Sequence, residues 1–116
     1  FPTRRSSDLT SNQFVLPSGT YYIEASAPSQ KADRHKLRLR NITAGTTPLN
    51  GTSENVDGSV TAASRSFITG EVIITVPTTF ELQHYTQSAS TTVGLGNATS
   101  SGDSEIYTVC KITKIR

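Results

Sequence analysis

The sequence predicts an all-β protein, and three observations support this prediction. A strict two-residue alternation runs through residues 21–27, which is the period of a β-strand. The chain holds 18 Thr and 15 Ser among 116 residues, and Thr is enriched in strands. No segment shows the 3.6-residue period of an amphipathic helix. Roughly six or seven short strands, separated by Gly and Pro turns, indicate an antiparallel β-sandwich.

The predicted strands follow one another with turns or polar loops between them. The first strand leaves the turn at Pro17-Ser18-Gly19 and places Tyr21 and Ile23 on one face and Tyr22 and Glu24 on the other. Further strands are expected at residues 35–42, 63–69, 72–76, 80–85 and 105–115, with Gly70 separating two of them. Residues 43–61 and 87–103 are rich in Gly, Ser, Thr and Asn and are expected to be loops, the first with a short strand at 49–53.

Both faces of the last predicted strand carry apolar or aromatic side chains. Ile106, Cys110 and Ile112 share one face, while Tyr107 and Val109 lie on the other. An antiparallel strand in a monomer is normally solvated on one face. The chain offers no helix to cover the second face, so the pattern indicates a partner subunit.

The charge and cysteine content exclude several classes of protein. A net charge of +2 is too small to indicate a nucleic-acid partner. The most basic stretch, residues 34–40, alternates cations with leucines, which favours a solvated strand face over an anion or glycan contact. Cys110 is the only cysteine, so an intrachain disulfide is excluded. We expect no membrane insertion, because no apolar run is long enough.

The sequence carries no signature of catalysis or metal binding. His35 and His84 are the only histidines, and no Gly-x-Ser-x-Gly element accompanies them. The alternation of His84 with Phe80 and Leu82 predicts a histidine at the rim of the core. Glu54 and Asp57 near a glycine are weak evidence for calcium. We therefore predict a protein that is not an enzyme, with no catalytic, cofactor-binding or metal-ligating residues.

The first nine residues, FPTRRSSDL, differ in composition from the rest of the chain. This string resembles the conceptual translation of a common sequencing-library adapter. The rival interpretation is a genuine basic arm formed by Arg4 and Arg5. We interpret residues 1–9 as a non-native segment and residues 10–116 as one domain.

Several short elements together resemble the C1q/TNF-like jelly-roll domain, in the version found in bacteriophage tail fibres and related virion proteins. The resemblance covers residues 9–115. The elements that carry it are Leu16-Pro17-Ser18-Gly19-Thr20-Tyr21-Tyr22-Ile23-Glu24, Arg34-His35-Lys36, Gly51-Thr52-Ser53-Glu54, Arg65-Ser66-Phe67, Phe80-Glu81-Leu82-Gln83-His84-Tyr85 and Glu105-Ile106-Tyr107.

This resemblance implies a jelly-roll β-sandwich that forms a homotrimer, with one sheet of each subunit facing the threefold axis. It implies a core of Tyr21, Ile23, Phe67, Ile74, Phe80, Leu82, Ile106, Cys110 and Ile112. The implied trimer interface consists of Tyr22, Glu24, Glu81, Gln83, Tyr85, Tyr107, Val109 and Lys111, where Lys111 pairs with Glu24 or with Glu81.

The function implied is that of a non-enzymatic head domain of a phage tail fibre or virion surface protein, which trimerises and attaches to a glycan or protein of the host surface. The alternative is a purely structural trimer-forming cap of a bacterial collagen-like or surface fibre, located at the bacterial cell surface. Loops at the end of a β-scaffold usually carry recognition, so we expect receptor contacts from Thr47, Asn50, Thr52, Asn55, Thr91, Thr92 and Asn97.

The chain departs from the family pattern at its beginning. A complete domain of this family has one or more strands upstream of the Leu-Pro-x-Gly turn, where the adapter-like segment stands here. We therefore expect missing N-terminal strands, an unpaired sheet edge beside the opening or the closing strand, and a lower stability than that of a longer chain.

Overall fold

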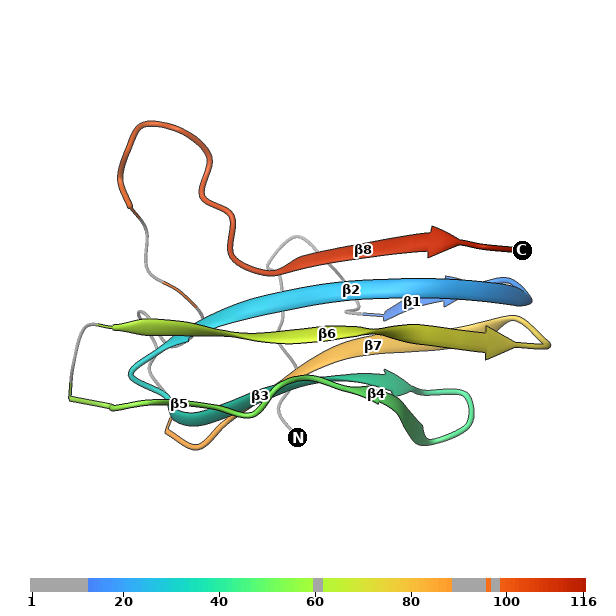
Figure 1. Ribbon diagram of the computed structural model, residues 1–116, viewed down its shortest axis with the longest axis horizontal. Coiled ribbons are helices and arrows are strands. Elements are labelled where there is room, and N and C mark those ends of the chain that lie inside the picture. Colours follow the sequence, from blue (N-terminus) through green and yellow to red (C-terminus); the bar gives the residue numbers. More distant parts are fainter. Residues whose placement is uncertain (1–12, 60–61, 89–95, 97–98) are drawn as a thin grey trace.

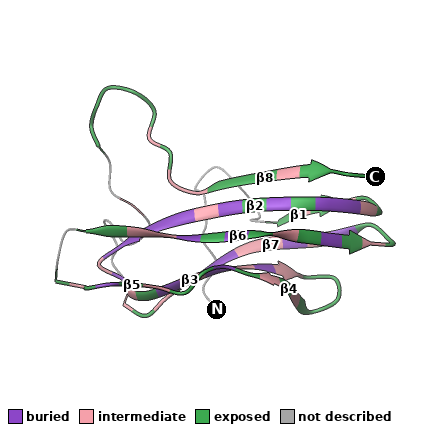
Figure 2. Ribbon diagram, in the orientation of Figure 1, coloured by how far each residue is buried: buried purple, intermediate pink, exposed green. Residues whose placement is uncertain are grey.

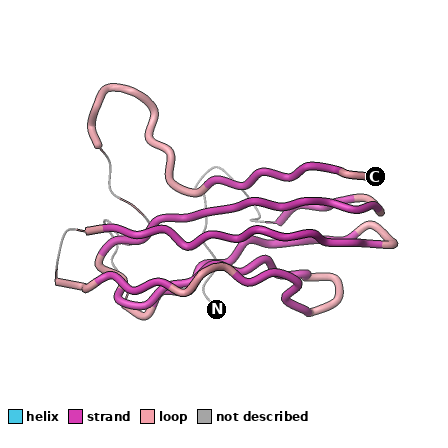
Figure 3. The backbone as a smooth tube through the Cα atoms, viewed as in Figure 1, coloured by secondary structure: helices cyan, strands magenta, loops and turns pink. Residues whose placement is uncertain are grey.

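The computed structural model describes residues 13–59, 62–88, 96 and 99–116 and arranges them as two antiparallel sheets (Figure 1). The all-β prediction is confirmed, because the described residues form strands and loops and no helix (Figure 3). The strands are β1 (Gln13–Leu16), β2 (Gly19–Gln30), β3 (Asp33–Asn41), β4 (Thr46–Asn50), β5 (Glu54–Val56), β6 (Ala63–Ile74), β7 (Thr78–Thr86) and β8 (Val109–Lys114). The adapter-like residues 1–9 lie outside the described residues.

One sheet has the order β1-β7-β3-β4, with β5 pairing the other end of β3, and the second sheet has the order β6-β2-β8. Every strand pair in both sheets is antiparallel. The chain changes sheet between β1 and β2, between β2 and β3, and again before β6, β7 and β8. In the described part of the chain, β2 is the centre of the three-stranded sheet, and β6 and the closing strand β8 are its edges.

The core fills the space between the two sheets. Tyr21, Ile23 and Phe80 are buried there as predicted, and Ile74, Leu82 and Ile112 pack against them while partly buried. The ring of Phe14 on β1 stacks on that of Phe80, with their centroids 5.9 Å apart. Ala25, Ala27, Leu37, Leu39, Ile68 and Val72 complete the buried cluster. Buried and more exposed residues alternate along β2 from Tyr21 to Ala27, and the residues from Ala27 to Gln30 are all buried (Figure 2).

Three residues predicted for the core are exposed. Phe67 lies on the outer face of β6, because its neighbours Ser66 and Ile68 take the inward positions. Ile106 precedes β8, which begins only at Val109 rather than at residue 105. Cys110 stands opposite the buried Ala25 on the core-facing side of β8, yet it is exposed. The core therefore does not extend under the first half of β8.

The predicted break at Gly70 is wrong, because β6 runs without interruption from Ala63 to Ile74. A Cβ at residue 70 would lie 2.4 Å from Cδ2 of Leu49 on β4. Gly70 thus makes room for a side chain from the opposite sheet. The predicted loop at 43–61 is also corrected, since it contains β4 and β5.

The turn between β1 and β2 is held by the first residues of the long strand. The Tyr21 hydroxyl donates a hydrogen bond to the carbonyl of Pro17 at 2.7 Å. The backbone N–H of Thr20 donates to the carbonyl of Arg116 at 2.8 Å. A Cβ on Gly19, whose φ is 155°, would lie 2.8 Å from that same carbonyl oxygen. Glycine at this position lets the chain end approach the turn.

A hydrogen-bonded junction links the two sheets where the pairing of β3 passes from β5 to β4. Leu37 pairs with neither β4 nor β5. Its carbonyl accepts a hydrogen bond from the N–H of Gly51, in the loop between these strands, at 2.8 Å. The Leu37 N–H donates to the Ser66 hydroxyl at 3.0 Å, and that hydroxyl donates to the Thr52 carbonyl at 2.6 Å. We call Leu37, Gly51, Thr52 and Ser66 the Ser66 junction. It provides partners for backbone groups that would otherwise be buried without one.

Candidate interaction surfaces

The outer face of the β6-β2-β8 sheet is the first candidate surface, and we call it the three-stranded face. The outward positions follow from the alternation of burial along β2 and β6 and from the register with β8. They are Tyr22, Glu24 and Ser26 on β2, Arg65, Phe67, Thr69, Glu71 and Ile73 on β6, and Val109, Lys111 and Thr113 on β8.

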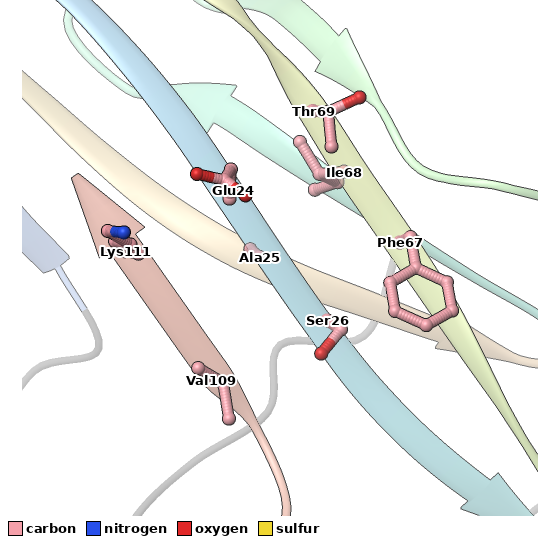
Figure 4. Close-up of a pocket in the computed structure, with 8 residues that line it drawn as sticks. All are labelled: Glu24, Ala25, Ser26, Phe67, Ile68, Thr69, Val109 and Lys111. Atoms are coloured by element: carbon pink, nitrogen blue, oxygen red, sulfur yellow. The ribbon is translucent and has the colours of Figure 1, made fainter. Parts of the chain in front are cut away.

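Large apolar side chains lie exposed on all three strands of this face. Tyr22 is 40% exposed, Phe67 51%, Ile73 70% and Val109 44%. An open groove of about 250 Å³ runs over β2 between Phe67 on β6 and Val109 on β8 (Figure 4). Extended exposed apolar patches on soluble proteins mark interaction sites.

The three-stranded face also carries charged and polar side chains. Glu24 on β2 and Lys111 on β8 are direct register partners, so their opposite charges lie side by side. The guanidinium of Arg65 donates to the Ser26 hydroxyl at 3.1 Å and to the Tyr107 carbonyl. Arg65 therefore ties the segment before β8 to the centre of the sheet.

The structure divides the predicted interface residues other than Tyr107 between two surfaces. Tyr22, Glu24, Val109 and Lys111 lie together on the three-stranded face. Glu81, Gln83 and Tyr85 are on β7, in the other sheet, where they point away from Phe80, Leu82 and His84. Of the two carboxylates predicted to pair with Lys111, Glu24 is its neighbour and Glu81 belongs to the opposite sheet.

Tyr107 belongs to neither surface. It lies before β8, beside a loop glycine: a Cβ on Gly96 would stand 2.5 Å from Cδ1 of Tyr107 and 3.2 Å from Cγ of Pro28. The segment carrying Tyr107 therefore packs over the β2 end at Pro28. The predicted strand at 105–115 placed this residue on a sheet face, and the later start of β8 removes it from there.

Sequence reasoning missed the apolar residues that β6 contributes to the three-stranded face. Phe67 was assigned to the core and Ile73 was assigned to no surface. The alternation Ser66, Ile68, Val72 carries the signal that identifies the outward positions of this strand. The core position of Phe67 was implied by the resemblance and not by this alternation.

The outer face of the β3 and β7 strands is the second candidate surface, and it is polar. Arg38 Nε donates to Gln83 Oε1 at 2.7 Å, and Gln83 Nε2 donates to Glu81 Oε1 at 2.5 Å. Arg40 Nη1 donates to the Thr47 hydroxyl at 2.9 Å. Partial burial and the nearby Arg40 charge lower the pKa of Arg38 from its ordinary value. This surface therefore concentrates positive charge along β3.

The predicted receptor residues are partly strand residues. Thr47 and Asn50 lie on β4 and Asn55 on β5. The Thr52 hydroxyl accepts a hydrogen bond from the Phe67 N–H at 3.0 Å, which holds this loop against β6. Thr91, Thr92 and Asn97 lie outside the described residues.

The two histidines are buried together between the sheets. His35 Nδ1 and His84 Nε2 are 3.0 Å apart, and His35 Nε2 lies 2.8 Å from the Ser64 hydroxyl. Burial lowers the pKa of His35, and the charge of Glu54 opposes this shift. The prediction of a rim position for His84 is corrected, because its side chain is only 2% exposed.

Within the described ranges, no three His, Cys, Asp or Glu side chains gather in a way that could hold a metal ion. The same residues form no helix able to cross a membrane. Comparison of the chain with protein-family models, with curated proteins and with solved structures returned no match in any of the three.

Proposed function

We propose that this chain is a non-enzymatic head domain of a phage tail fibre or virion surface protein, which forms a homotrimer and attaches to glycans of the host surface. In this proposal the fold is a jelly roll of the C1q/TNF-like type. The three-stranded face forms the contact between subunits, and the strands and loops of the opposite sheet remain available for attachment.

The exposed apolar side chains of the three-stranded face are the observation that supports trimerisation. Phe67 and Val109 flank an open groove, with Tyr22 and Ile73 exposed on the same sheet. Aromatic side chains are enriched at protein interfaces, because they bury a large area at low entropic cost. The neighbouring Glu24 and Lys111 supply a charged pair of the kind found at the rim of an interface.

Sedimentation equilibrium of the purified chain tests this proposal. We expect a trimer, and we expect Phe67→Lys to dissociate it to monomers, since the substitution places a charge in the apolar centre of the contact. Val15→Lys is the matched control, because Val15 is 63% exposed on β1 in the opposite sheet. Its substitution should leave the trimer intact.

A monomer at all concentrations, or a trimer that survives Phe67→Lys and dissociates with Val15→Lys, would contradict the proposed contact. Attachment is tested separately by binding of the labelled chain to candidate host cells. A trimer that binds no cell surface would support instead the structural cap of a bacterial surface fibre.

A further inference from the structure

Four cationic side chains alternate along β3 on the outer face of its sheet. They are Arg34, Lys36, Arg38 and Arg40, and the residues between them, His35, Leu37 and Leu39, are buried. Alternate residues on a strand are separated by about 6.6 Å. The basic stripe, as we call these four residues, therefore extends for about 20 Å in a straight line.

The two halves of the basic stripe differ in their partners. Arg38 and Arg40 are oriented by hydrogen bonds to Gln83 and Thr47, with the carboxylate of Glu81 nearby on β7. In the described part of the chain, no ion pair holds the side chains of Arg34 and Lys36. The nearest carboxylate of the groove, that of Glu54, therefore makes no direct ion pair with either cation at this end of the stripe.

Arg34 and Lys36 line a groove of about 360 Å³ at the end of the basic stripe. Ser53, Asn55 and Tyr85 line the groove with hydroxyl and amide groups, and His35 and Glu54 complete its walls. Asn55 is the register partner of Arg34 on β5, and Tyr85 that of Lys36 on β7. The groove thus combines two cations with side chains that donate and accept hydrogen bonds.

We propose that the groove and the basic stripe bind a linear acidic polysaccharide. This inference rests on the attachment role in the proposed function and names the ligand class. An extended chain that carries carboxylates or sulfates at regular intervals matches a straight row of cations, and its hydroxyls match Ser53, Asn55 and Tyr85. A nucleic acid fits less well, because single-stranded binding relies on several aromatic stacking platforms and this groove offers only Tyr85 among its lining residues.

Binding of the purified chain to polygalacturonate, heparin, neutral dextran and a single-stranded oligothymidylate tests the proposal by biolayer interferometry. We expect binding to an acidic polysaccharide and none to dextran. The double variant Arg34→Gln/Lys36→Gln should weaken this binding about tenfold or more, since two charge-assisted contacts are lost. Asn55→Glu, which places a carboxylate opposite Arg34, should weaken it in the same direction.

The matched control is Lys114→Gln/Arg116→Gln, which removes the same charge at the opposite end of the domain, beside the start of β2, and should bind as the parent chain does. Equal weakening by this control, equal binding of dextran, or tighter binding of oligothymidylate would overturn the proposal, as would no binding of either acidic polysaccharide. Sedimentation of the same samples separates the two ideas. If the chain is a trimer that does not bind acidic polysaccharides, only the proposed ligand of the groove is refuted. If the chain is a monomer that binds them, only the proposed trimerisation is refuted.

Discussion

Removal of the Ser66 hydroxyl should weaken the fold more than its small size suggests. Ser66 is fully buried, and its hydroxyl both accepts from Leu37 N and donates to the carbonyl of Thr52. In Ser66→Ala the Leu37 N–H remains buried without an acceptor, and the Thr52 carbonyl loses its donor. Thr52 is exposed, so water replaces the lost donor of its carbonyl. The expected loss is therefore that of one buried polar group without a partner, about 1–3 kcal/mol.

This loss is measurable by urea unfolding followed by far-UV circular dichroism. The unfolding free energy of a domain of this size falls by about 1–3 kcal/mol per molar urea, so the midpoint of unfolding should fall by about 0.5–1.5 M. Thr69→Ala is the matched control, because Thr69 lies exposed on the outer face of the same strand. A midpoint shift no larger for Ser66→Ala than for Thr69→Ala would refute the role of the Ser66 junction in linking the sheets.

Gly51→Ala should lower the melting temperature more than Gly70→Ala, because a Cβ at 51 would meet the Leu37 carbonyl at 2.9 Å, whereas at 70 it meets only the end of the Leu49 side chain; equal losses would contradict this. Burial lowers the pKa of His35 below its ordinary 6.5, so between the folded pKa and 6.5 the unfolded chain binds the additional proton. The contribution of His35 to the stability should be complete above pH 6.5. It should fall as the pH is lowered from 6.5 to the folded pKa, by at most about 1.4 kcal/mol per pH unit for one proton. A urea midpoint that does not change with pH in this range would disprove the prediction. Cys110 is exposed, and partial desolvation raises the pKa of its thiol, so the folded chain should react fully with a thiol reagent, but more slowly at neutral pH than an unstructured cysteine peptide, and a faster reaction would contradict this.

The sequence was sufficient to predict the class of fold and the two faces of β2. Alternation alone placed Tyr21 and Ile23 on one face and Tyr22 and Glu24 on the other, because each strand position has only two possible directions. Alternation does not tell which sheet a strand joins. Tyr22 and Tyr85 both point outward, yet they lie on opposite sheets, so a single predicted interface became two surfaces.

The errors in the predicted core arose from long-range packing. A glycine in a strand pattern predicts the end of the strand at Gly70. The side chain that fills the space beside Gly70 belongs to Leu49, which is distant in the sequence, so no local pattern reveals it. The resemblance implies a core position for Phe67, but Ser66 occupies the inward position, where its hydroxyl joins the two sheets. Polar residues with a specific hydrogen-bonding task are thus the positions at which hydrophobic patterning fails.

The hydrogen bond between Thr20 and Arg116 places the C-terminal residue at one end of the domain. Arg116 meets the start of β2, and β2 then runs for twelve residues, about 40 Å, to the end of the sandwich that carries β5 and the groove at Arg34 (Figure 1). A fluorescent protein or a capture tag joined after Arg116 would leave from the end opposite the groove. The chain immobilised in this way should present its basic end to solution, which makes the C-terminal position the appropriate anchor for binding measurements.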